Sequence, residues 1–196
     1  MIENRKEYKF VLNNNEIKNL LTIFSDKLNV LHPSRKITSL YFDTVDYRLF
    51  NNSKLFDTNK MKVRIRTYSN DNKFYKEIKF NDELGKRKMV TEIDATSFED
   101  VKELTEGGLT LIPSVYTSYT RNYYIFNDLR ITVDNKILFS SHKIRNLSKT
   151  KVEFSKSVVE YKLGENVSEI EKYFYLNPVA FSKYQTAVSE IYNIKN

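Results

Sequence analysis

The sequence predicts a single domain, residues 1–196, of the α+β class, in which amphipathic helices cover one face of an antiparallel sheet. With 196 residues and 40% hydrophobic side chains, the chain can fill one sizeable core and is too short for two ordinary ones. Its 14 Tyr and 13 Phe favour strands. In at least five segments charged residues recur two positions apart, which on a strand separates a charged face from an apolar one.

The first predicted element is an amphipathic helix from Asn13 to Leu31. Its apolar residues recur at spacings of three and four, and Asn or Asp residues are available as caps. We expect His32-Pro33 to end it. From Lys36 the pattern changes to the β-branched and aromatic run ITSLYFDT, which predicts a strand followed by a polar turn region over residues 43–52.

Two further strands, Met61–Tyr68 and Phe74–Phe80, are predicted on either side of the turn-like run SNDNK. Ser97–Thr105 is typical of a short helix, because Ser97 can cap it and acidic residues follow in its first turn. Beyond it the pattern predicts strands at residues 120–126, 129–135 and 157–163, and helices at residues 165–175 and 184–194.

Composition excludes several classes of site. The chain has no Cys and only two His, so disulfides, thiolate metal sites and cysteine nucleophiles are excluded and imidazole catalysis is disfavoured. The formal charge of +7 favours acidic partners, which include nucleic acids, anionic membranes and phosphate compounds. The N-terminus is charged rather than apolar, and no uncharged apolar run approaches the ~20 residues needed to span a bilayer. We therefore expect a cytoplasmic protein.

The alternation of charge along the strands carries the functional prediction. In Lys62, Arg64 and Arg66 the basic residues share one strand face, and the same division recurs in Glu77-Ile78-Lys79, RITVD, Glu160-Tyr161-Lys162 and the N-terminal RKEYK. On an open sheet such faces are ordinary solvated exteriors, and for any single pair that interpretation is favoured. If the sheet curls shut, they line a water-filled tunnel.

Repetition favours an anion site, because cations held close together repel one another unless an anion lies between them. An extended phosphate chain would receive charge-assisted hydrogen bonds from Arg64, Arg66, Lys79, Arg130 and Lys162. The acids among them, Glu7, Glu77, Asp134 and Glu160, are either structural partners of the bases or metal ligands. With oxygen donors beside phosphate, the metal would be a hard divalent ion, Mg(II) or Mn(II).

The chain resembles the polyphosphate polymerase domain of the vacuolar transporter chaperone (VTC) type, in the triphosphate tunnel metalloenzyme superfamily. The resemblance is carried by RKEYKFVL, HPSRKITSLYFDT, KVRIRTY, the EIK strand, RITVD, VVEYK and FSKYQTAV, in that order along nearly the whole chain. It implies an eight-stranded antiparallel β-barrel tunnel with helices packed on the outside. It also implies metal-dependent transfer of the terminal phosphate of ATP to a growing polyphosphate chain, commonly with manganese.

The resemblance also implies roles for single residues. By motif, Lys9 lies near the transferred phosphate, Arg64 and Arg66 form the phosphate-binding pair, and Lys79 follows from the EIK strand. Glu160 matches the metal-binding glutamate, and Glu7 and Asp134 are further candidate metal ligands. The remaining candidate phosphate ligands are Lys62, Lys88, Arg121, Arg130, Lys162, Ser182 and Lys183. Lys86 or Arg87 could take the place of Lys88.

One departure and several alternatives accompany this prediction. The first motif has Arg5 where the wider superfamily has Glu, which disfavours simple triphosphate hydrolysis. The alternatives are a metal-dependent triphosphatase or polyphosphatase and a non-catalytic module that binds polyphosphate or nucleotide. Nucleic acid is disfavoured because the bases alternate along strands instead of clustering on a helix. ATP and inorganic polyphosphate are the expected partners, with room for a separate membrane-protein partner that would hold the chain at a membrane surface.

Overall fold

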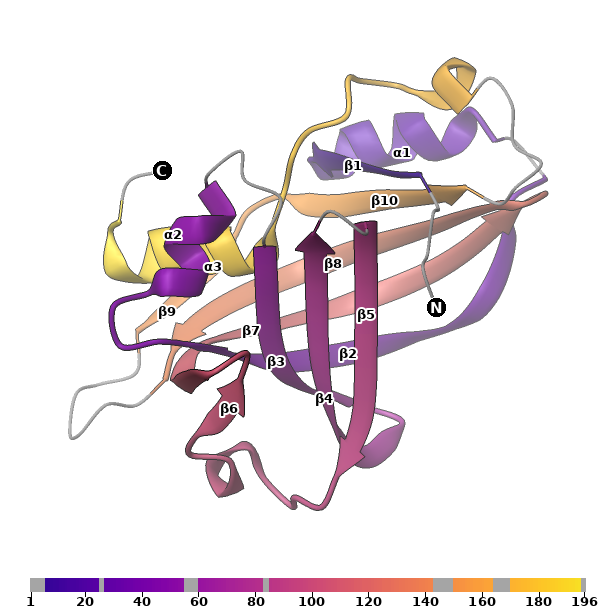
Figure 1. Cartoon of the computed structure of the whole chain (residues 1–196). Coiled ribbons are helices and arrows are strands. Elements are labelled where there is room, and N and C mark those ends of the chain that lie inside the picture. Colours follow the sequence, from indigo (N-terminus) through magenta and orange to yellow (C-terminus); the bar gives the residue numbers. More distant parts are fainter. Residues whose placement is uncertain are drawn as a thin grey trace.

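A computed structural model describes residues 6–24, 27–54, 60–82, 85–142, 150–163 and 170–194. Eight strands form one antiparallel path in the order β1-β10-β8-β7-β2-β3-β4-β5 (Figure 1). Two short strands extend it, β6 beside β7 and β9 beside β8. The strands are β1 (Glu7–Leu12), β2 (Asn29–Asp43), β3 (Lys60–Tyr68), β4 (Asp71–Asp82), β5 (Gly85–Ile93), β6 (Leu104–Glu106), β7 (Leu109–Phe126), β8 (Leu129–Ser141), β9 (Lys151–Phe154) and β10 (Ser157–Leu163).

Three α-helices accompany the sheet: α1 (Asn14–Thr22), α2 (Arg48–Lys54) and α3 (Lys183–Tyr192). Short 3-10 turns occur at Phe98–Asp100 and Ile170–Tyr173. No helix in the described ranges has both the length and the apolar character needed to span a bilayer.

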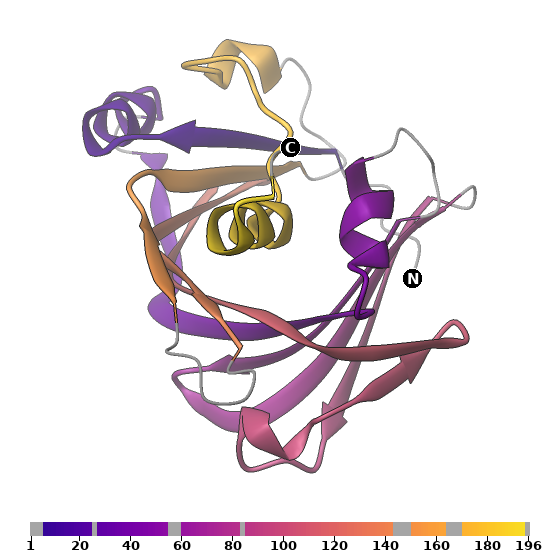
Figure 2. The ribbon, with the colours of Figure 1, turned by 90° about the vertical axis from the view of Figure 1, so that its left-hand side faces the viewer.

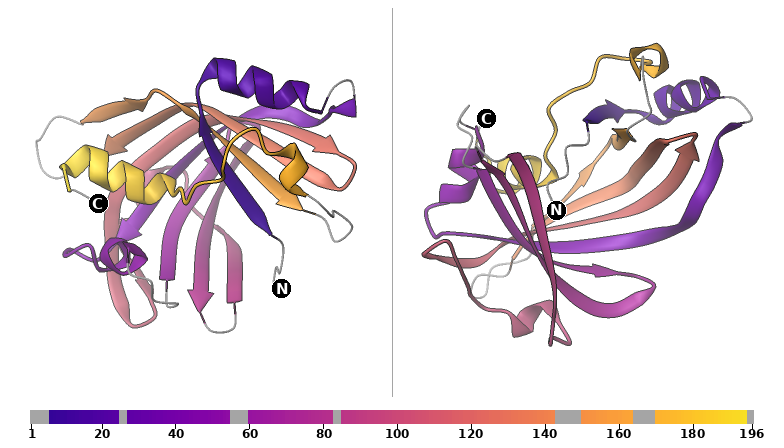
Figure 3. Two further views of the ribbon diagram at one scale, coloured as in Figure 1. Left: turned by 90° about the horizontal axis from the view of Figure 1, so that it is seen from above. Right: turned by 45° about the vertical axis from the view of Figure 1, so that its right-hand side comes forward.

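The sheet curls into a half-barrel (Figures 2 and 3). The predicted α+β class and antiparallel eight-strand path are confirmed. Strands β1 and β5 lie at the two ends of the path, and no ladder joins them among the residues that the structure describes. The concave face therefore stays open along one side, and it carries the charged side chains discussed below.

The convex face is apolar and covered, as the two-faced strands predict. Helix α1 packs Leu20 and the adjoining Phe24 onto β1, β8 and β10, where Phe10, Ile131 and Tyr161 are almost fully buried. A second convex cluster lies on β2, β3 and β4 beneath the segment that contains Phe98. Packing of these apolar residues on the convex face thus stabilises the curled sheet.

Helix α3 is placed differently, because it packs on the concave face. Its Tyr184, Ala187 and Val188 cluster with Tyr41, Tyr119, Phe139 and Val158. In the register, Tyr41 pairs with Arg64, so α3 lies on the same sheet face as the predicted cations. It fills one end of the half-barrel, as Figure 2 shows.

Several element boundaries differ from the sequence prediction. The helix predicted over residues 13–31 ends at Thr22, and β2 already begins at Asn29, with Pro33 inside it. The β2–β7 register shifts between His32 and Arg35, and such an irregularity tolerates a proline that cannot donate to the ladder. The region predicted as a turn contains α2, whose residues lack an apolar period of their own.

Other differences concern strands. Residues 97–105 form a 3-10 turn and the start of β6 rather than one short helix, and β5 and β9 were not predicted. The predicted strand at 120–126 is the last part of a much longer β7, and the expected turn SNDNK is already inside β4 from Asp71 onward. Of the helix predicted at 165–175, residues 170–175 fall within the described residues, where Ile170–Tyr173 form a 3-10 turn and the last two residues are not helical; Arg5 falls outside the described residues.

Candidate functional site

The register gathers the predicted site residues on the concave face. Partners that face each other across an antiparallel pair share a side of the sheet. Through such pairs the face combines β1 with β10, β8 with β7, and β3 with β4 and β5. The pairs are Glu7–Lys162, Lys9–Glu160, Lys162–Arg130, Asp134–Arg121, Lys62–Lys79, Arg64–Glu77 and Lys79–Lys88.

Glu77 is the centre of one ionic cluster on this face. Its carboxylate is 1% exposed and accepts hydrogen bonds from Arg64 Nε at 2.8 Å and Lys88 Nζ at 3.0 Å, and Arg66 Nη1 lies 3.4 Å away. Although burial opposes it, the charges of Arg64, Arg66 and Lys88 hold the pKa of Glu77 far below its usual range. One anion thus faces three cations, which leaves positive charge for a ligand.

Neutral side chains position the two arginines. Tyr41 OH accepts from Arg64 Nη1 at 2.8 Å, and Ser39 Oγ accepts from Arg66 Nε at 3.0 Å. Tyr119 OH accepts from Arg66 Nη2 at 3.2 Å. Sequence reasoning did not select these three residues. The alternation of β2 and β7 would have placed them on the face of the bases, but no chemical signal in the sequence distinguishes them from core tyrosines and serines.

Asp134 forms a second cluster. Arg121 Nε donates to Oδ1 at 2.5 Å and Nη2 to Oδ2 at 2.7 Å, and Lys183 Nζ from the start of α3 donates to Oδ2. The carboxylate is buried, and these two cations lower its pKa in spite of that burial. Both oxygens of Asp134 are therefore engaged by cations, and its predicted role as a metal ligand stays a prediction.

The segment before α3 crosses to both sides of the concavity. Val179 N donates to Lys9 O at 2.8 Å, and Lys9 Nζ donates to Phe181 O at 3.2 Å. From β3, Lys62 Nζ donates to Ser182 Oγ at 2.8 Å. Ser182 is also the N-cap of α3. Four predicted site residues, Lys9, Lys62, Ser182 and Lys183, are thereby brought to one end of the cationic face.

Two lysines of the cationic face, Lys79 and Lys62, have pKa values lowered toward neutral pH. Burial and the charge of Arg64 lower the pKa of Lys79 to about 7. Burial, together with the charges of Lys9 and Arg64, lowers the pKa of Lys62 to about 8. Lys79 on β4 also interacts with the charges of Glu160 and Lys162 on β10. The curl therefore places strands from opposite ends of the sheet within electrostatic reach.

The comparisons with known proteins agree with this geometry. The model of the VTC domain family matches residues 4–107 and 87–192, which together span nearly the whole chain. The chain belongs to the VTC domain family. No curated protein matches it.

Solved structures share the fold of this VTC domain at low identity. A candidate adenylate cyclase from Bacillus halodurans is 14% identical with a TM-score of 0.60, over 93% of this chain and 96% of that one. One from Vibrio parahaemolyticus is 12% identical with a TM-score of 0.52, over 92% and 95%. A candidate adenylyl cyclase from Hippeastrum, for which a dominant triphosphatase activity is described, is 16% identical with a TM-score of 0.50, over 95% and 96%.

The carboxylates Glu7 and Glu160 of the VTC domain form the best candidate for a metal position. The two side chains share a hydrogen bond. Burial and this bond raise the pKa of Glu7. Although burial opposes it, the same bond and the charge of Lys162 hold the pKa of Glu160 well below its usual range. Lys162 Nζ lies 3.2 Å from Glu160 and 3.8 Å from Glu7. Two adjacent carboxylates repel each other, and a divalent cation bound between them would relieve that repulsion.

The number of acidic groups limits what this position can hold alone. No cluster of three or more His, Cys, Asp or Glu residues with metal-binding geometry occurs in the described part of the chain. Mg²⁺ is usually held by one or two carboxylates with substrate phosphates and water completing its shell. Glu7 and Glu160 fit that donor set, so a metal here depends on a phosphate ligand.

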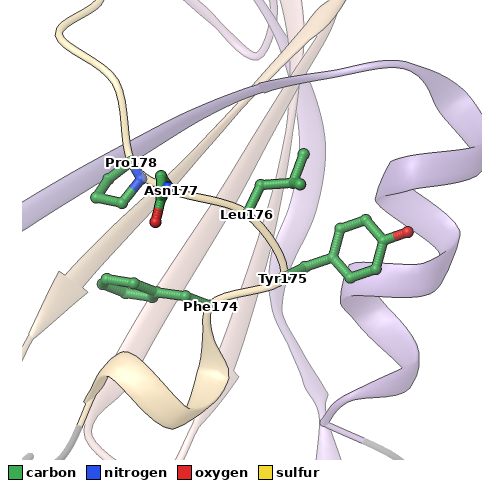
Figure 4. A pocket seen from close by; sticks show the side chains of 5 residues that line it. All are labelled: Phe174, Tyr175, Leu176, Asn177 and Pro178. Atoms are coloured by element: carbon green, nitrogen blue, oxygen red, sulfur yellow. The ribbon is translucent and has the colours of Figure 1, made fainter.

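A separate hollow of about 560 Å³ lies outside the cationic face. It is lined by the consecutive residues Phe174 to Pro178, which precede the segment that reaches Lys9 (Figure 4). In Figure 4 the Tyr175 ring points toward α1, where Asn19 Nδ2 donates to its hydroxyl at 3.1 Å. Its lining offers no charged group, so the hollow has no part in the phosphate site.

Proposed function

We propose that this VTC domain is a metal-dependent enzyme acting on triphosphates, and that it transfers the terminal phosphoryl group of ATP to inorganic polyphosphate. The observation that carries the proposal is the excess of cations over carboxylates on the concave face of a tunnel-type half-barrel. Lys9, Arg64, Arg66, Lys79 and Glu160 are its proposed catalytic residues. Lys62, Lys88, Arg121, Arg130, Lys162, Ser182 and Lys183 are its proposed phosphate ligands.

Phosphoryl transfer asks the protein mainly for positioning and charge stabilisation. Arg64 and Arg66 are held by Glu77, Tyr41, Ser39 and Tyr119, so both guanidiniums are already positioned on the concave face before a phosphate binds. In the proposed reaction the bond between the terminal phosphorus and its bridging oxygen breaks, a bond to a terminal oxygen of the acceptor chain forms, and ADP leaves. The cations neutralise the charge that spreads over the transferred oxygens.

Glu160, with Glu7, would hold the divalent metal, either Mn(II) or Mg(II). When bound, such an ion neutralises phosphate oxygens and polarises the reacting phosphorus. Lys9 pairs with Glu160 in the register, so it would meet the same phosphate from the adjacent strand. We further propose a cytoplasmic site of action, with a separate membrane-protein partner where the chain works at a membrane.

A triphosphatase is the second candidate, and the likeness to the Hippeastrum protein favours it. In that reaction water replaces the acceptor phosphate in the same cavity. The two activities differ in their products rather than in the phosphate ligands they need.

The test is to incubate the purified chain with ATP and either Mn(II) or Mg(II), to resolve products on a gel stained for polyphosphate, and to assay free phosphate in parallel. Chains that an exopolyphosphatase degrades establish the transferase. Free phosphate without chains establishes the hydrolase. Tight polyphosphate binding without turnover, with both metals, indicates a binding module.

A further inference from the structure

Beyond the ionic clusters of Glu77 and Asp134, the concave face continues into a cluster of arginine and tyrosine at the end opposite α3, which includes the proposed phosphate ligand Arg130. Arg35 on β2, Tyr68 on β3, Tyr123 on β7 and Arg130 on β8 form this distal cluster. Along β2, Arg35 lies four residues from Ser39, the partner of Arg66, which at ~3.3 Å per residue is roughly 13 Å of strand. Arg35 was not among the residues that the sequence selected.

The two tyrosines hold the Arg35 guanidinium in place. Its carbon lies 4.9 Å from the ring centres of both Tyr68 and Tyr123. Arg35 Nη2 and Nε donate to Tyr123 OH at 2.9 and 3.3 Å. A guanidinium fixed between two rings loses little further freedom when it binds a ligand, and the hydroxyl that it contacts does not neutralise its charge.

Arg130 adds a second uncompensated charge beside the same tyrosine. Its guanidinium carbon lies 5.8 Å from the Tyr123 ring centre. Its Nε is buried without a hydrogen-bond partner in the described structure. In the register Arg130 also faces Lys162, whose own carboxylate partners are Glu160 and Glu7. Within the described residues, neither Arg35 nor Arg130 has an ion pair with a carboxylate.

Two guanidiniums that share one ring and lack acidic partners repel each other unless an anion lies between them. We infer that the distal cluster binds phosphates of a polyphosphate chain that extends beyond Arg64, Arg66 and Lys79, and that Arg35 sets a preference for long chains over triphosphate. This rests on the proposed function, because it extends the same cationic face. A nucleoside is a poorer occupant, since a neutral base leaves both charges unmet and the space between the two tyrosine rings is already filled by Arg35.

The test compares three ligands in calorimetric titrations of the full chain: tripolyphosphate, ATP and a long polyphosphate. Arg35→Gln should weaken binding of the long chain about tenfold, the size of one lost charge-assisted hydrogen bond, and change tripolyphosphate affinity less than twofold. Lys36→Gln is the matched control, because it removes the same charge from the neighbouring, exposed residue on the other side of β2. It should leave all three affinities unchanged.

Arg35→Lys separates charge from geometry, because it keeps the charge and loses the planar group between the rings. It should bind the long chain with an affinity between those of wild type and Arg35→Gln. Melting temperatures of the ligand-free variants show whether the fold is retained. If Arg35→Gln melts well below wild type, Arg35→Lys and Tyr123→Phe, which keeps the ring and removes the acceptor hydroxyl, carry the same comparison.

Three results would overturn the inference: unchanged long-chain affinity in Arg35→Gln, an equal loss for tripolyphosphate and the long chain, or a loss confined to ATP. A loss confined to ATP would show that the cluster binds the nucleoside part of ATP. Failure of the proposed function looks different. If wild type binds the long chain through Arg35 but turns over neither ATP nor polyphosphate, the distal subsite stands and the enzymatic proposal falls.

Discussion

At the scale of single residues, Glu77 shows how a buried acid organises a cationic site. Its carboxylate faces Arg64, Arg66 and Lys88. Among the described residues Glu77 is the carboxylate that pairs with both arginines, so Glu77→Gln removes this compensation and should lower the free energy of unfolding at pH 7 by about 3 kcal/mol. Urea denaturation measures this loss, and tripolyphosphate should restore more stability to the variant than to wild type.

The lowered pKa of Glu77 also predicts how the stability of the protein changes with pH. The folded-state pKa of Glu77 is lowered, so its contribution is complete above the unfolded value of about 4.3 and is lost as the pH falls below it toward the folded value. Wild type should therefore lose stability below about pH 4 more steeply than Glu77→Gln. Parallel acid profiles in the two proteins would show that Glu77 is not the group responsible.

Lys79 makes a second prediction at this scale, for ligand binding. Because its pKa is lowered to about 7, the free lysine is largely neutral at pH 8, and a bound phosphate chain favours its charged form. Binding of tripolyphosphate at pH 8 should take up protons, which titrations in buffers of different ionisation enthalpy measure. Lys79→Arg stays charged and should reduce the uptake, leaving the part due to Lys62, whose pKa is about 8.

At the scale of elements, α3 is fixed to α2 through one buried acid. Asp43 at the end of β2 accepts from Leu49 N at 2.8 Å and Phe50 N at 2.9 Å, and Tyr184 OH donates to the same carboxylate. This contact sets where the first residues of α3, Ser182 and Lys183, meet the cationic face. The seven-residue helix α2, which has no apolar period of its own, is thus held by its contacts with Asp43 and α3.

Tyr184→Phe tests this anchor. Loss of one hydrogen bond to a buried carboxylate should cost about 1–3 kcal/mol of stability and weaken phosphate binding by displacing the start of α3. Tyr192→Phe is the matched control, because it loses a hydrogen bond to Ser114 O, 3.0 Å long, at the other end of the same helix. It should lower stability and leave affinity unchanged. Equal effects of both variants on affinity would contradict a positioning role for Tyr184.

The success of prediction also varied by element, for physical reasons. Strand β10 was predicted to the residue and β3 to within one, because charged and apolar residues alternate along most of β3 and from Val159 to Leu163 in β10. Helix α2 was missed because it has no apolar period of its own: its Leu49 and Phe50 N–H groups donate to Asp43 at the end of β2, and Phe50 packs against Tyr184 of α3. Strand β5 was missed because it lies at the sheet edge with both faces largely exposed, so it lacks a buried period.

At the scale of the whole molecule, the sequence predicted the charged sheet face, and the resemblance implied its curl. Neither could predict that α3 fills one end of that face, because the apolar stripe of α3 does not say which side of the sheet it covers. Arg130 was predicted on the charged face, but its grouping with Arg35 around Tyr123 was equally hidden. It depends on the register of β2, β7 and β8, which the β2 irregularity at His32 shifts.

The curl makes a last prediction about the whole fold. The segment through Val179, Phe181 and Ser182 touches Lys9 on β1 and Lys62 on β3, strands that are far apart along the sheet. A phosphate chain in the concavity would bind both sides at once. At a concentration a hundred times its Kd, tripolyphosphate should stabilise the fold by about 2.7 kcal/mol, and binding to both sides decides where in the fold that stability appears.

Hydrogen exchange measures where that stability appears. We expect slower exchange in β1, β10, β3 and β4 together, because the ligand joins the two sides of the half-barrel, and little change around α1, which packs on the convex face. Arg64→Ala should lose the added protection on β1 and β10 as well as on β3. Protection confined to β3 and β4 would show that the anion binds one wall of the half-barrel and does not bridge its concavity.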